Sequence, residues 1–193
     1  MTPGEGLWRR WTVAALLLSF LGACAWGADQ TSVETKRKAV FIGKLLRFVE
    51  WPGVEAGEQR PKFQFCVAGD SFMSFAISEE VHGTTVRGRA IEVRTVWRDM
   101  DVTGCEALYL AESAKGMSVK WLQKVKGTRV LTLGEERGFL EAGGMVQITC
   151  RNDLVQFEVN LQSVRSGGLK IDARLLELAK GVTQGGKAAG EVR

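Results

Sequence analysis

Hydrophobic and polar positions alternate along the chain with two different periods, which predict helices and strands in turn. The segment 34–49 carries a wide apolar stripe opposite a basic face, which is typical of an amphipathic helix. We expect Thr31 or Ser32 to cap this helix and the Trp-Pro-Gly sequence at 51–53 to end it. The segment 89–97 instead alternates apolar and polar residues, as a half-buried strand does.

Shorter apolar runs predict strands that are covered on both faces. The runs 145–150 and 154–160 flank an Arg-Asn-Asp turn and predict an antiparallel hairpin. Gly69, Asp70 and Ser71 follow a strand-like run and precede a helical one, so we interpret them as a turn with a helix cap. In all, we expect helices at 34–49, 71–81, 118–125 and 172–182, and strands at 62–68, 89–97, 105–111, 130–133, 145–150 and 154–160.

This order of elements predicts an α/β fold, namely a single-domain sandwich with a mixed β-sheet flanked by helices and an antiparallel hairpin in its C-terminal half. We expect the domain to span residues 32–182. Its closing helix should bury Leu175, Leu176 and Leu178. Residues 183–193 are mostly Gly, Ala and charged residues, and we expect them to form a flexible tail.

Residues 1–28 have the features of a signal peptide and its processing region. Arg9 and Arg10 precede an apolar run at 12–23, which is about half as long as the roughly 20 residues of a membrane-spanning helix. Small residues follow the run, as they do at a cleavage site. The Leu-Gly-Ala-Cys sequence at 21–24 resembles a lipobox, so a lipoprotein anchored through Cys24 is an alternative, and an uncleaved anchor is another.

Composition excludes several classes of function. The chain of 193 residues has a single histidine, His82, so neither a His-rich metal site nor a two-histidine metal motif can be built. The net charge of +4 is small, and no basic run exceeds three residues. The aromatic residues are not interleaved with basic ones either. We therefore expect no metal, no cofactor and no nucleic-acid partner.

Motifs for enzymatic chemistry are also missing from the sequence. It contains no Gly-rich dinucleotide fingerprint, no phosphate-binding loop and no Gly-x-Ser-x-Gly elbow. Glu135 and Glu136 are adjacent acids in a glycine-rich loop, and we interpret them as solvated loop residues. His82 lies at a predicted helix end, where we expect a surface role. The sequence therefore predicts a protein that is not an enzyme.

Four arginines surround the predicted strand 89–97: Arg87, Arg89, Arg94 and Arg98. One interpretation is a solvated face of the sheet. The other is a docking surface for an acidic partner or ligand.

Export would leave three cysteines in the mature chain: Cys66, Cys105 and Cys150. In an oxidising compartment two of the three can pair. Cys66 and Cys105 lie in strand-like segments, so a disulfide between them is our preferred expectation and two buried thiols are the alternative. Cys150 would then remain as a thiol at a strand end.

Ordered motifs along residues 38–182 resemble the YfiR family of exported bacterial regulators. The opening residues 38–41 and 47–52 and the strand at 65–70 are similar to the start of that family. The later motifs follow in the family's order: Gly88-Arg89-Ala90-Ile91, Thr132-Leu133-Gly134, Gly138-Phe139 with Gly143-Gly144-Met145, Phe157-Glu158-Val159-Asn160, Gly168-Leu169 and residues 175–179.

The resemblance implies a small, often dimeric periplasmic α/β protein without a catalytic site. The best-understood members of the family bind the periplasmic sensor part of an inner-membrane diguanylate cyclase, which keeps cyclic di-GMP and biofilm formation low, and the family also occurs beside other sensor systems. Cys66 and Cys105 stand where the family's disulfide is expected. Better-studied members have a further cysteine pair, for which this chain has only Cys150, so the resemblance does not extend to a second bridge.

Two segments are our candidates for binding a partner. One is the closing helix with Leu175, Leu176 and Leu178. The other is the loop with Glu135, Glu136, Arg137 and Phe139. Two rival hypotheses remain: a small-molecule-binding module for another envelope sensor or transport system, and a hydrolase that depends on His82.

Overall fold

The computed structural model describes residues 25–52, 60–97 and 102–184. The chain divides into two compact units, residues 1–34 and 35–193, and every strand of the fold belongs to the second unit. The expected signal peptide lies almost entirely outside the described residues, as do Cys24, Arg98 and most of the expected tail.

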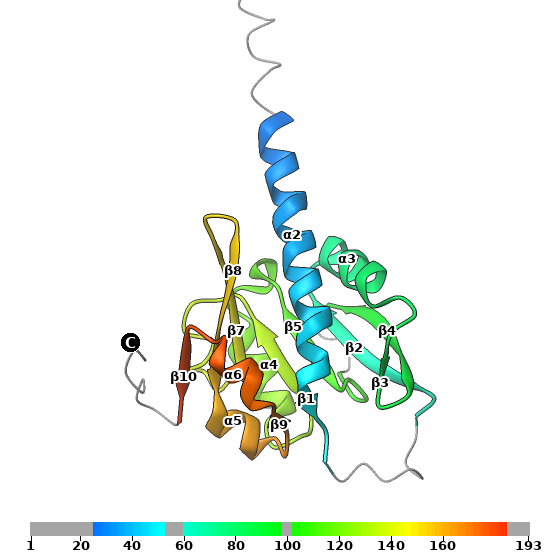
Figure 1. Ribbon diagram of the computed structural model, residues 1–193, viewed down its shortest axis with the longest axis vertical. Coiled ribbons are helices and arrows are strands. Elements are labelled where there is room, and N and C mark those ends of the chain that lie inside the picture. Colours follow the sequence, from blue (N-terminus) through cyan, green and yellow to red (C-terminus); the bar gives the residue numbers. More distant parts are fainter. Residues whose placement is uncertain (1–24, 53–59, 98–101, 185–193) are drawn as a thin grey trace, which may run out of the picture. The chain divides into compact units, whose positions relative to one another are not determined.

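The central feature of the second unit is a mixed sheet of eight strands in the order β10-β8-β7-β6-β5-β2-β4-β3 (Figure 1). Its middle strands, from β4 to β7, pair in parallel, whereas β8 is antiparallel to β7 and β3 is antiparallel to β4. The strands are β2 (Lys62–Ala68), β3 (Thr85–Val86), β4 (Arg89–Val96), β5 (Ala107–Leu110), β6 (Leu131–Gly134), β7 (Val146–Arg151), β8 (Leu154–Asn160) and β10 (Gly181–Thr183). The expected α/β class with a mixed sheet is confirmed.

Helical segments connect the strands and flank the sheet (Figure 1). Asp70 caps α3 by accepting a hydrogen bond of 2.9 Å from the Met73 backbone N–H, so the turn and cap expected there are confirmed. The α-helices are α2 (Ala25–Leu45), α3 (Ser71–Val81), α4 (Ser118–Val125), α5 (Leu161–Ser166) and α6 (Ala173–Glu177), and the 3-10 turns are η1 (Leu46–Phe48) and η2 (Glu112–Ala114).

Strand β2 contributes to two hydrophobic cores, one on each face of the sheet. Phe63, Phe65 and Val67 belong to the larger core, together with buried residues of α2, α3, α5 and α6. Cys66 and Ala68 alternate with them and belong to the smaller core, which α4 completes. Because successive strand residues point to opposite faces, this nearly continuous apolar run is what a strand covered on both faces needs.

The hairpin of β7 and β8 is confirmed in its expected place. Its strands pair from Val146↔Val159 to Arg151↔Leu154. Asn152 and Asp153 form the turn with positive φ angles of 48° and 64°, a backbone that Asn and Asp tolerate better than most residues. The structure also has short elements that the periodicity did not indicate, among them β3 and α5.

The first predicted helix is wrong in its boundaries. Helix α2 runs from Ala25 to Leu45, so Thr31 and Ser32 lie inside it and do not cap it. Its apolar pattern continues into η1 and then into β1 (Val49–Glu50), which pairs antiparallel with β9 (Lys170–Ile171). The helix ends before the predicted residue 49 because the backbone of Val49 pairs with β9, a strand that is distant in the sequence.

The closing helix is also shorter than expected. Helix α6 ends at Glu177, and residues 181–183 form β10 in parallel with β8. The Lys180 backbone N–H donates to the Phe157 carbonyl at 2.9 Å, so pairing with an open strand edge replaces further helical turns. Leu175 is buried as expected, but Leu178 is 74% exposed, so the expectation that it is buried is wrong.

No helix in the described ranges combines the length and the apolar character that crossing a bilayer requires.

Candidate functional site

A disulfide joins Cys66 of β2 to Cys105, which lies just before β5. Strands β2 and β5 are neighbours in the sheet, and the two Cα atoms are 5.8 Å apart, a spacing suited to a disulfide. Both residues are buried. The bond spans 39 residues, and closing a loop of this length stabilises the fold by about 4 kcal/mol in the chain-entropy account.

Arg94 of β4 contacts both sulfurs of the disulfide. Its Nη2 lies 3.6 Å from the Sγ of Cys66 and 3.5 Å from the Sγ of Cys105. Arg94 reaches them because it is the register partner of Cys66. A guanidinium in this position favours a thiolate over a thiol once the bond is reduced.

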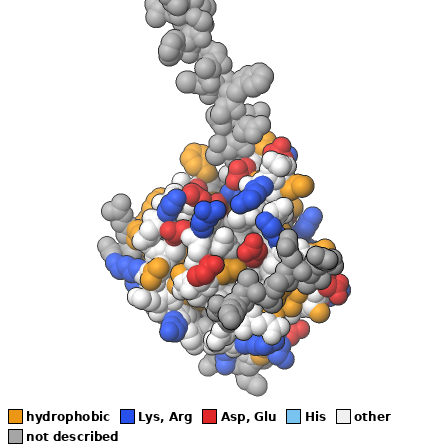
Figure 2. Space-filling model, turned by 90° about the vertical axis from the view of Figure 1, so that its left-hand side faces the viewer, with side chains coloured by type: hydrophobic (Ala, Val, Ile, Leu, Met, Phe, Trp, Pro, Cys, Tyr) orange, Lys and Arg blue, Asp and Glu red, His pale blue; other side chains and the backbone are white. Residues whose placement is uncertain are grey.

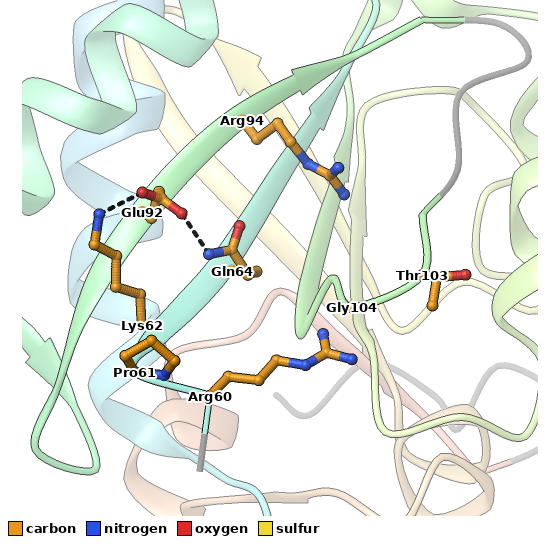
Figure 3. Close-up of a pocket in the computed structure, with 8 residues that line it drawn as sticks. All are labelled: Arg60, Pro61, Lys62, Gln64, Glu92, Arg94, Thr103 and Gly104. Atoms are coloured by element: carbon orange, nitrogen blue, oxygen red, sulfur yellow. Dashed lines mark hydrogen bonds and ion pairs between the residues drawn. The ribbon is translucent and has the colours of Figure 1, made fainter.

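Polar side chains of β2 and β4 form a strip beside the disulfide, made of Lys62, Gln64, Glu92 and Arg94 (Figure 3). Glu92 accepts from Gln64 Nε2 at 2.6 Å and pairs with Lys62 Nζ at 2.5 Å. The hydrogen bond from Gln64, followed by that from Lys62, lowers the pKa of the Glu92 carboxyl. With Arg60, Pro61, Thr103 and Gly104, this polar strip lines a pocket of about 480 Å³.

A second pocket of about 650 Å³ shares Arg60, Thr103 and Gly104 with the first. An ion pair lines it: Arg89 Nη1 and Nη2 lie 3.0 and 2.5 Å from the two carboxylate oxygens of Glu106. The side chains of Arg89 and Glu106 are only 11% and 17% exposed. Arg89 also lies 5.6 Å from the centre of the Phe63 ring.

The four arginines near β4 therefore do not form one solvated face: of the three that the structure describes, Arg87 is exposed, whereas Arg89 and Arg94 are partly buried. Arg89 is largely buried against Glu106. Arg87 donates to the Trp51 carbonyl, and Arg94 contacts the disulfide. The partners differ because Arg87 lies in the turn between β3 and β4, whereas Arg89 and Arg94 lie on β4 itself.

Glu135 is not the solvated residue that the sequence suggested. Its side chain is 8% exposed and accepts from Lys38 Nζ at 2.6 Å and from the Tyr109 hydroxyl. Strand β6 ends just before Glu135, whose backbone N–H donates to Leu110 of the neighbouring strand. The carboxylate is thereby held against Lys38 of α2, in an arrangement that compensates for its burial.

Glu136 also has structural partners. Its Oε2 accepts from the Ser118 hydroxyl at 2.5 Å and its Oε1 from the Gly116 backbone N–H at 3.2 Å. The carboxylate thus lies at the amino end of α4, where the helix dipole favours negative charge. Glu136 is therefore half-buried and bonded to the start of α4, and it is less solvated than the sequence suggested.

The rest of the predicted docking loop divides between core and surface. Phe139 is 1% exposed and packs so closely on Gly134 and Gly144 that a Cβ at either would lie within 2.5 Å of its ring. Arg137 is exposed. Phe139 and Leu175 belong to different hydrophobic cores, so the two candidate segments do not share one packed cluster.

Two exposed phenylalanines were not among the candidate binding residues predicted from the sequence. Phe72 and Phe75 are 81% and 68% exposed and lie three residues apart on α3. Residues at this spacing are neighbours on a helix surface. The signal was present in the sequence, because α3 has more apolar residues than the buried face formed by Met73, Ile77 and Val81 can hold.

The remaining candidates contribute no cluster with evident chemistry. His82 is exposed at the C-cap of α3. Within residues 25–52, 60–97 and 102–184, no three His, Cys, Asp or Glu side chains come together as metal ligands would. Cys150 lies in β7 and forms no disulfide in these ranges. On the side shown in Figure 2, basic, acidic and hydrophobic side chains are interspersed.

A family model described as YfiR/HmsC-like matches residues 35–180, which lie entirely within the second compact unit.

Proposed function

The chain belongs to the YfiR/HmsC-like family, and from this membership we propose that it is a periplasmic negative regulator of an inner-membrane diguanylate cyclase. It binds the cyclase's periplasmic sensor part more tightly in the inactive state than in the active one. A binding partner shifts such an equilibrium only through a difference in affinity between the two states. The consequence is less cyclic di-GMP and less biofilm.

The single observation that carries this proposal is the family match, which covers the sheet from β2 to β8 and the helices that flank it. The buried disulfide supports the periplasmic location, because such bonds persist in oxidising compartments and are rare in the cytosol. In keeping with a family of non-catalytic regulators, the protein acts by binding.

The exposed side chains suggest where binding occurs. Of the segments expected to bind a partner, Arg137 and Leu178 reach the surface, whereas Phe139 and Leu175 support the fold from within. Phe72 and Phe75 add a larger apolar surface on α3. Exposed aromatic side chains are costly in water and frequent at the centres of protein interfaces. We include this α3 surface in the docking face, and we propose that the working form is a homodimer.

A binding experiment with purified proteins tests this proposal. The mature protein is titrated into the periplasmic sensor region of a membrane-bound diguanylate cyclase from the same organism, and affinity is measured by calorimetry. Phe72→Ser with Phe75→Ser should weaken binding by about tenfold or more, because interface aromatics dominate affinity.

The matched control is Leu154→Ser, which removes another exposed apolar side chain, 65% exposed, from the tip of the hairpin. It should leave the affinity unchanged. Absence of binding by the unaltered protein would contradict the proposed function, whereas equal affinity of all three proteins would contradict only the α3 surface.

A further inference from the structure

A basic groove lies beside the disulfide and has no role in the function proposed above. It consists of the two pockets of about 480 and 650 Å³, which adjoin because both are lined by Arg60, Thr103 and Gly104. Each volume falls within the range of small-molecule sites in proteins. The groove is concave, unlike the flat surfaces through which most proteins dock.

Positive charge dominates the lining of the groove. Among the described residues it has six cationic side chains and two carboxylates, and each carboxylate is already bonded to one of the cations. A concave site lined mainly by one sign of charge concentrates ions of the opposite sign. The cations are Arg60, Lys62, Arg89, Arg94, Lys124 and Arg129, and the carboxylates are Glu92 and Glu106.

Arg60 lies against Gly104 at the junction of the two pockets. A Cβ on Gly104 would come within 2.9 Å of the Arg60 guanidinium carbon, so a side chain at position 104 would displace the guanidinium from this place. The backbone of Gly104 also has a φ of +88°, which side chains disfavour. The guanidinium groups of Arg60 and Arg94 both turn toward the loop that carries Gly104 (Figure 3).

The second pocket supplies the apolar part of a ligand site. Trp51, Val102 and Val130 line it together with Arg60 and Lys124. Ligand sites commonly combine such apolar walls with a few polar groups that fix orientation. Lys124 is held in place over the ring of Trp121, at 5.0 Å from the ring centre.

We propose that the basic groove binds a small molecule with at least two anionic groups, carboxylate or phosphate. One anionic group lies at the junction against Arg60, and the other lies in the second pocket toward Lys124. A guanidinium fork suits either anion, because it can donate two parallel hydrogen bonds to a carboxylate or a phosphate. Arg94 lines the same groove and contacts the disulfide, so a bound ligand would lie close to the disulfide.

Calorimetric titration of the mature protein with pyrophosphate and, separately, with citrate tests the proposal at physiological ionic strength. Saturable binding of pyrophosphate alone identifies a phosphate ligand, and of citrate alone a carboxylate ligand. Arg60→Gln with Lys124→Gln should weaken the binding by about tenfold or more, since both anionic groups lose a partner.

The matched control is Lys44→Gln with Arg47→Gln, which removes the same charge from two exposed positions outside the groove. It should change the affinity by less than about twofold if binding is local to the groove. If a double variant fails to fold, as judged by its circular dichroism, the single variant Lys124→Gln replaces it. No saturation by either probe up to about 10 mM, or equal weakening in both double variants, would overturn the proposal.

Discussion

The guanidinium Nη2 of Arg94 lies 3.5 Å from the Sγ of Cys105, so a positive charge is in contact with the disulfide. The bond itself is buried, yet the residues beside it open into the basic groove. Arg94 therefore links the disulfide, which stabilises the fold and can be reduced, with the groove in which a ligand would bind.

Replacing Arg94 should make the disulfide harder to reduce. When two glutathione molecules donate two electrons to the bond and become glutathione disulfide, any cysteine thiolate that forms is stabilised by Arg94, and Arg94→Gln removes that stabilisation. We expect the equilibrium constant for reduction in a glutathione buffer at pH 8 to fall by about fivefold, as suits a charge-assisted contact. Thiol labelling followed by mass spectrometry measures it. Arg165→Gln, an exposed control, should change nothing; unchanged reduction in Arg94→Gln would remove this role.

Removing the disulfide should destabilise the protein only under oxidising conditions. Cys66→Ala with Cys105→Ala releases the constraint on the unfolded chain, and we expect the melting temperature to fall by about 10 °C. In dithiothreitol the variant and the unaltered protein should melt together. Differential scanning calorimetry in both buffers measures this, and the same difference in both would show that lost packing is responsible.

Replacing only one residue of the buried ion pair between Lys38 and Glu135 should strongly destabilise the protein. Glu135→Gln removes the carboxylate that the buried ammonium of Lys38 contacts at 2.6 Å, and we expect the free energy of unfolding to drop by about 3 kcal/mol. The double variant Lys38→Met, Glu135→Leu should recover part of this loss. Urea unfolding measures all three proteins. Glu141→Gln, which alters an exposed acid, is the control. If Glu135→Gln lowered the free energy of unfolding as little as Glu141→Gln does, the result would contradict the burial of the pair.

Asp172 should make the stability of the protein depend on pH in the acid range. Its hydrogen bonds with the side chain and backbone of Arg174 lower the pKa of the carboxyl from 3.8 to about 2. Because the folded pKa lies below the unfolded one, this contribution is complete above about pH 4 and disappears as the pH falls toward 2. Asp172→Asn should therefore be less stable than the unaltered protein at pH 6 and equally stable at pH 2. A difference that persists at pH 2 would assign the effect to the uncharged cap.

Local patterns in the sequence were sufficient where an element is determined by its own residues. The amphipathic spacing of 118–125 gave the boundaries of α4, and the alternation and turn residues of 145–160 gave the hairpin. The fold class followed from the order of such elements. By contrast, β1, β9 and β10 are short and gain their backbone partners from distant strands, so no local period marks them.

The same distinction applies to the functional residues. The Cys66–Cys105 pair could be expected because few cysteines remain and both precede or lie within buried strands. The partner of Glu135 could not, because Lys38 lies 97 residues earlier and only the closed sheet brings the two together. The basic groove was visible only in part: Arg89 and Arg94 were candidates for contacting an acidic ligand, but Arg60 and Lys124 come from segments with no shared motif.

The most direct test of the central proposal is the cellular level of cyclic di-GMP in a strain that lacks this gene. It is compared with the parent strain and with a strain complemented by the gene. The proposed repression of a diguanylate cyclase predicts a rise on deletion, reversed by the complementing copy. An unchanged level across growth conditions, in a strain that expresses a diguanylate cyclase with a periplasmic sensor part, would contradict it.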